Sequence, residues 1–162
     1  MWNKKQSIML SLICTKVIIV VVVILVVALA ATLISPDLYN DIFGGLHLFT
    51  PNQIQFAIPL LLLAAVPAFT ALFSLHRLLS HIRAGEVFTV NNIRLLRTIS
   101  WACFAASILF FIGFFRFIPV GGIEISMFLI ASFAGFVGLI MRVVKNVIDA
   151  ARELKDENDF TI

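Results

Sequence analysis

The chain has 162 residues, of which 61% are hydrophobic and 13% are charged, and its mean hydropathy is +1.07. A soluble domain is rarely more than half apolar, so this composition excludes an ordinary soluble domain and predicts an integral membrane protein. The formal net charge of +3 does not indicate direct binding of nucleic acid, because basic residues that flank membrane spans normally set topology.

We predict an all-α membrane protein that folds as one bundle of four transmembrane helices over residues 1–162. The spans are expected near residues 11–34, 54–75, 99–115 and 125–144. Each run is about long enough to cross a hydrocarbon core of about 30 Å at a rise of about 1.5 Å per residue. The composition therefore implies the lipid bilayer as the first partner of this chain.

The first span begins with a charged residue. The uncharged run from Val17 to Ile34 is longer than the apolar region of a signal peptide, so we expect a retained span. Lys16 precedes this run and either reaches the inner membrane interface or marks an ion path. The first interpretation is favoured, because the four spans hold no acidic or histidine residue at mid-membrane depth.

The second helix follows the phrase FTPNQI, which is typical of a helix start. We expect Thr50 to be the N-cap and Pro51 the first helical residue, where the missing N–H of proline costs nothing. A helix from Pro51 to Ala84 would be about 51 Å long, about 20 Å longer than a bilayer core is thick. Pro59 and Pro67 lie within it, and we interpret them as static kinks in preference to a gating hinge.

The third helix follows a nearly identical phrase, FTVNNI. Thr89 is the expected N-cap, Phe88 the apolar residue before it and Asn92 the third residue of the helix. Gly85 suits the left-handed position that ends the second helix. We therefore predict that both helices continue past the membrane on one side, over about residues 76–98, and that the fourth helix does so over about 145–157.

The basic residues predict the orientation. Arg116 alone lies on one side, and the other side carries Lys4, Lys5, Arg77, Arg83, Arg94, Arg97, Arg142, Lys145, Arg152 and Lys155. Because basic loops stay in the cytoplasm, we predict a multi-pass protein of the cell membrane with both termini inside.

Small residues at helical spacing predict where the helices meet. They are Ala64, Ala68 and Ala71 on the second helix, Ala102 and Ala106 on the third, and Ala131 and Gly135 on the fourth. Such faces let helices approach closely in lipid. Packing inside one molecule is the favoured interpretation, and a homo-oligomer is the alternative.

The turn between the second and third helices is the candidate partner-binding surface, formed by Arg77, His81, Arg83, Arg94 and Arg97. Three interpretations stand: attraction to anionic lipids, docking of a cytoplasmic protein, or a collar that only sets topology. His76 and His81 diverge by about 140° on a helix, which is unsuited to a shared metal. We find no constellation for catalysis, a cofactor or a metal, so the chain is predicted to be no enzyme.

The run LLSHIRAGEVFTVNNIRLLRTISW resembles the signature of the YoaS-like family of small four-span bacterial membrane proteins, classed as a domain of unknown function. The resemblance implies that Gly85, Phe88, Thr89 and Asn92 form a turn. It also implies a partner such as a helix-turn-helix transcription regulator, which the membrane protein would hold or signal to.

Our first functional hypothesis is therefore a non-enzymatic regulatory or interaction protein whose cytoplasmic end binds such a regulator. The second is a membrane-protection or immunity protein, or a small accessory subunit of a transporter. A channel or transporter is disfavoured, because the spans hold no acidic residues.

Overall fold

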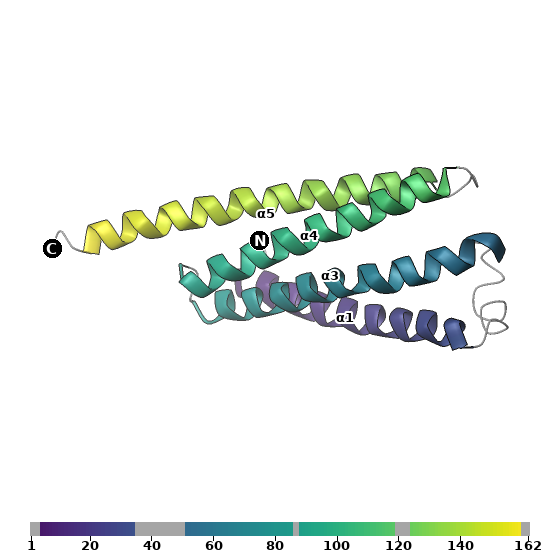
Figure 1. Cartoon of the computed structure of the whole chain (residues 1–162). Helices are drawn as coiled ribbons and strands as arrows, with labels where there is room; N and C mark the ends of the chain where they lie inside the picture. The colour runs from purple at the N-terminus through teal and green to yellow at the C-terminus, as the bar shows by residue number, and fades with distance from the viewer. Residues whose placement is uncertain (1–3, 35–50, 86–87, 119–123, 160–162) are drawn as a thin grey trace.

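The computed structural model is all-helical, and it describes residues 4–34, 51–85, 88–118 and 124–159 (Figure 1). Its elements are α1 (Lys4–Ile34), α3 (Pro51–Arg83), α4 (Val90–Phe117) and α5 (Glu124–Asp159). All four helices are long and apolar enough to cross a membrane. The prediction of an all-α protein with four helices long and apolar enough to cross a membrane is confirmed.

Successive helices run in opposite directions (Figure 1). The start of α1, the end of α3, the start of α4 and the end of α5 consequently lie at one end of the molecule, where α5 projects beyond the other helices. We call this the basic end, because it carries Arg77, Arg83, Arg94, Arg97, Arg142, Lys145, Arg152 and Lys155. Arg116 lies near the opposite end of α4.

The bundle is open. Among the described residues, α1 packs against α3, α3 against α4 and α4 against α5, and no other pair of helices is in contact. Large apolar side chains such as Ile24 on α1 and Phe133 on α5 consequently remain exposed. A lipid-facing surface accounts for this exposure, since lipid tails are as apolar as the side chains themselves.

Two serines of α4 close its contact with α5. The hydroxyl of Ser100 donates a hydrogen bond to the carbonyl oxygen of Gly138, and that of Ser107 donates to the carbonyl of Ala131, both at 2.8 Å. The backbones of α4 and α5 lie close together at this point, as a Cβ added at Gly138 would lie only 3.3 Å from the Ser100 carbonyl oxygen. Small residues therefore bring the two helices within reach of side chain-to-backbone hydrogen bonds.

The predicted small residues are distributed across these contacts. Ala64, Ala102 and Ala131 are buried, and the position of Gly135 lies against the hydroxyl of Ser107. Gly113 of α4 faces Leu60 of α3 closely enough that an added Cβ would lie 2.6 Å from Leu60 Cδ2. Packing inside one molecule thus uses these residues.

The prolines of α3 do not end the helix. Helix α3 continues through Pro59 and Pro67 to Arg83. Three turns after Pro67 it reaches a buried cluster near the basic end, formed by Leu78 with Leu96 and Ile99 of α4. This cluster fixes the ends of α3 and α4 against each other and so positions the turn between them.

Candidate interaction surface at the basic end

The end of α3 is shaped by a left-handed glycine. Gly85 has a φ of +88°, a conformation that glycine adopts without the steric cost that a Cβ would add. Its N–H donates to the carbonyl of Ile82 at 3.1 Å, and the N–H of Ala84 donates to that of Ser80 at 3.1 Å. These bonds satisfy carbonyls that the helix end would otherwise leave unpaired.

The start of α4 is capped by Thr89. Its backbone is extended, and its hydroxyl oxygen accepts a hydrogen bond from the N–H of Asn92 at 3.4 Å. Phe88, just before the cap, is about half exposed. The corresponding residue at the start of α3, Thr50, lies outside the described residues.

A buried hydrogen bond ties the two helices together across the turn. The side chain of Asn92 is 1% exposed, and its Oδ1 lies 2.8 Å from Nδ1 of the half-buried His81. Because an amide oxygen only accepts, this geometry places the proton on Nδ1 of the histidine. His81 thus helps to hold the hairpin, and its predicted part in partner binding stays a prediction.

The four arginines of the hairpin are all exposed: Arg77, Arg83, Arg94 and Arg97. Within the described part of the chain, no carboxylate forms an ion pair with any of them. The Arg77 guanidinium lies over the ring of Phe73 on its own helix, 5.8 Å from the ring centroid. The hairpin therefore presents positive charge that these residues do not neutralise.

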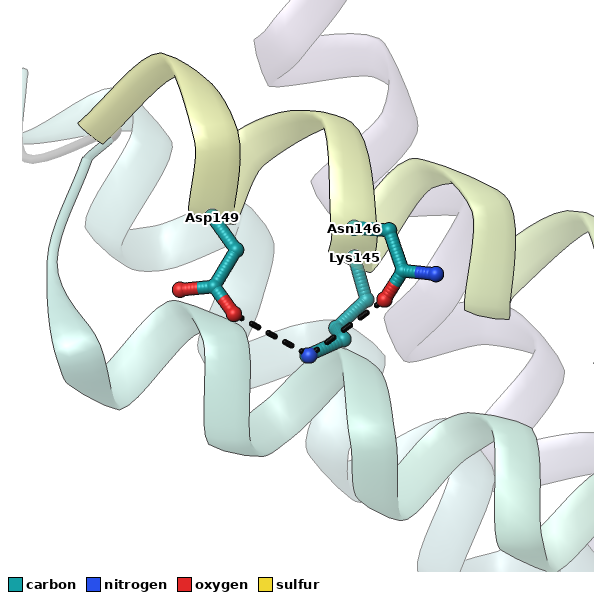
Figure 2. A network of polar contacts seen from close by, with 3 residues as sticks. All are labelled: Lys145, Asn146 and Asp149. Carbon is teal, nitrogen blue, oxygen red and sulfur yellow. Dashed lines mark hydrogen bonds and ion pairs between the residues drawn. The ribbon is translucent and has the colours of Figure 1, made fainter. Parts of the chain in front are cut away.

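Two of the four basic residues of α5, Lys145 and Arg152, differ because they pair with carboxylates of the same helix. Figure 2 shows the Lys145 ammonium between Asp149, at 3.1 Å, and the side-chain oxygen of Asn146, at 3.3 Å. Arg152 pairs in the same way with Asp156, at 3.7 Å. The positive surface of the basic end is consequently centred on the hairpin of α3 and α4.

Arginines lie over aromatic rings at two levels of the molecule. At the basic end, Arg142 of α5 lies over Trp101 of α4, 5.7 Å from the ring centroid. At the opposite end, Arg116 of α4 lies over Phe56 of α3 at 4.2 Å. Phe73, the ring beneath Arg77, marks the basic-end level on α3, and Phe56 marks the opposite one. The two rings are about 26 Å apart along α3, close to the thickness of a hydrocarbon core. Tryptophan is enriched at membrane interfaces and arginine side chains reach toward them, so these levels suit the two boundaries.

The described residues offer no grouping suited to a metal ion. Among residues 4–34, 51–85, 88–118 and 124–159, no three His, Cys, Asp or Glu side chains are grouped so that they could hold a metal ion. The interhelical serines and the His81–Asn92 bond were not anticipated from sequence. The signal for the serines was available, since Ser100 and Ser107 are polar residues two turns apart in an apolar helix.

The four helices and the separated charge define a multi-pass helical membrane protein. The chain belongs to the family described as "Protein of unknown function (DUF2975)", which matches residues 47–162 and thus α3, α4 and α5 with the hairpin between them. The expected membership of a domain-of-unknown-function family is thereby confirmed. No curated protein and no solved structure matched the chain.

Proposed function

We propose that this protein is a non-enzymatic regulatory or interaction protein of the bacterial cytoplasmic membrane. Its basic end lies in the cytoplasm and binds a cytoplasmic protein that presents an acidic surface. The observation that carries the proposal is the set of exposed hairpin arginines without carboxylate partners among the described residues. Complementary charge of this kind speeds association and selects among partners.

The arrangement of charged and aromatic residues supports a cytoplasmic position for the hairpin. If the inner boundary lies at Trp101 and Arg142, α5 continues about 26 Å past the membrane to its last residue. Helix α3 continues about 9 Å past Arg77 to Arg83 by the same reasoning. Exposed helices that are anchored in lipid at one end suit the docking of another protein.

The rigidity of the hairpin also supports the proposal. The buried Leu78–Leu96–Ile99 cluster and the His81–Asn92 bond hold the helix ends, so little order has to be gained on binding. The resemblance to small membrane proteins paired with helix-turn-helix regulators favours such a regulator as the partner. On this proposal, the membrane protein holds the regulator at the bilayer or signals to it.

The first test is charge reversal at the hairpin. Tagged wild-type protein, the double variant Arg94→Glu/Arg97→Glu and the control Arg116→Glu would be purified from native membranes, and the co-purifying proteins quantified. We expect at least one protein to be retained by wild type and control, lost from the double variant, and released as salt rises. Equal retention of every co-purifying protein by all three would refute the proposed docking surface.

The second test concerns orientation. Asn91 is exposed at the start of α4, so a cysteine placed there would be reachable by a membrane-impermeant thiol reagent. In a background with Cys14 and Cys103 replaced by alanine, we expect labelling only after the cells are opened. Labelling in intact cells would place the basic end outside and contradict the proposal.

A further inference from the structure

We propose that the seam between α1 and α3 binds an anionic glycerophospholipid of the inner leaflet, with the phosphate held between Lys16 and Arg83. This site shares Arg83 with the hairpin arginines of the proposed docking surface, but Arg94 and Arg97, at which docking is tested, are not among the residues that line it. Its evidence is a pair of grooves on one helix pair, one cationic and one largely apolar.

The cationic groove has a volume of about 330 Å³. Its lining residues are Met9, Leu12, Ile13, Lys16, His76, Ser80 and Arg83. Lys16 and Arg83 are exposed, and no carboxylate is among the described residues that line the groove. Two cations that line the same groove repel each other, and a bound anion relieves that repulsion.

His76 brings a buried nitrogen without a described hydrogen-bond partner to this groove. Its Nδ1 is buried, and it has no hydrogen-bond partner among the described residues. A buried polar nitrogen without a partner costs free energy, and most such groups in folded proteins are paired. A phosphate oxygen in the groove would give this ring an acceptor after rotation of the side chain, and the Ser80 hydroxyl could donate to the same anion.

The apolar groove lies next to the cationic one, further along the same seam. It has a volume of about 410 Å³ and is lined by Ile19, Phe69, Thr70, Phe73 and Ser74. Its centre lies about 12 Å along α3 from that of the cationic groove, on the side away from the basic end. A headgroup in the first groove would direct an acyl chain into the second.

This continuity selects a lipid over the other possible occupants. A free phosphate would use the cationic groove and leave the apolar one empty. An acidic protein segment would meet the apolar groove at the depth where lipid tails lie, since Phe73 is at the level assigned to the membrane boundary. Anionic lipids also concentrate where basic residues flank a span.

The test uses delipidated full-length protein in neutral detergent, with lipid retention measured by native mass spectrometry. Phosphatidylglycerol, phosphatidylcholine and inorganic phosphate would be titrated separately. We expect phosphatidylglycerol to bind more tightly than phosphatidylcholine. Each of Lys16→Gln and Arg83→Gln should weaken phosphatidylglycerol about tenfold, the effect of losing one charge-assisted hydrogen bond. The matched control Arg97→Gln, an exposed arginine outside the groove, should leave binding unchanged.

Two variants that retain every charge sharpen the result. Ser80→Trp should fill the cationic groove and weaken both phosphatidylglycerol and phosphate. Ile19→Trp should fill the apolar groove and weaken the lipid alone. Circular dichroism would verify that each variant is folded, and Arg83→Gln, at an exposed helix end, serves if a change inside the membrane prevents folding.

The proposal would be overturned if the double variant Lys16→Gln/Arg83→Gln bound phosphatidylglycerol as tightly as wild type. It would also be overturned if Arg97→Gln weakened phosphatidylglycerol binding as much as the groove variants do. Binding of inorganic phosphate without binding of the lipid would overturn the lipid assignment. Failure here would leave the docking proposal standing, because docking is tested at Arg94 and Arg97, which are not among the residues that line this groove.

Discussion

The hydrogen bond between His81 and Asn92 yields a prediction that follows directly from the structure. The two atoms are 2.8 Å apart, the Asn92 side chain is 1% exposed, and the bond joins the last turn of α3 to the first turn of α4. Replacing Asn92 with alanine removes the acceptor Oδ1 and leaves Nδ1 of His81 without this hydrogen bond. We expect the free energy of unfolding to fall by about 1–3 kcal/mol.

A double-mutant cycle separates this bond from other effects. Asn92 takes part in a further interaction besides the one with His81, so the single variant overstates the bond. Comparing His81→Ala, Asn92→Ala and the double variant should give a coupling energy of about 0.5–1.5 kcal/mol, the usual net value of one hydrogen bond. The backbone N–H at position 92 would still donate to Thr89, so the cap is preserved.

The assay is reversible unfolding in mixed micelles of dodecylmaltoside and SDS, followed by circular dichroism. Asn91→Ala is the matched control, because it removes the same chemical group from the neighbouring, exposed position. We expect the control to change the unfolding free energy by less than about 0.5 kcal/mol. A coupling energy of zero, or a control as costly as Asn92→Ala, would refute the assigned role of the bond.

Three further substitutions can be measured in the same assay. Gly138→Ala should lower the free energy of unfolding by about 1–3 kcal/mol, since its Cβ would lie 3.3 Å from the Ser100 carbonyl oxygen. The control Ser132→Ala, at an exposed position, should be neutral. Equal effects of the two would contradict the close approach of α4 and α5. Gly85→Ala should cost about 1–2 kcal/mol because φ is +88°, and Gly85→Asn should cost less; the reverse order would argue against backbone strain. Thr89→Ala should cost about 0.5–1 kcal/mol through its lost cap, and no change would show that the 3.4 Å bond is ineffective.

The existence of the four helices could be predicted from composition and length, because only long apolar runs satisfy their backbone inside lipid. Cap chemistry located the start of α3 at Pro51 and that of α4 at Val90, where the structure also begins them. Local rules suffice for such features, since a cap involves residues three or four positions apart. Helix α3 ends at Arg83, one residue before the predicted Ala84.

The contacts between helices could not be predicted in the same way. Helix α1 is apolar on nearly every side, so no periodicity indicates which face meets α3. The partners of Ser100 and Ser107 are carbonyl groups, which every residue carries, so the sequence marks the donors without marking the acceptors. Likewise, Lys16 and Arg83 are distant in sequence, and only the antiparallel register of α1 and α3 brings them to one groove.

The two outer seams of the bundle differ in a way that bears on function. The α4–α5 seam is closed by small residues and by two serine-to-carbonyl hydrogen bonds, so it leaves little room for a ligand. The α1–α3 seam instead contains both grooves of the proposed lipid site. Among the described helices, α1 contacts α3 alone. Occupation of this seam would therefore act first on α3 and on Arg83 at its end, which is one of the hairpin arginines where we place the partner.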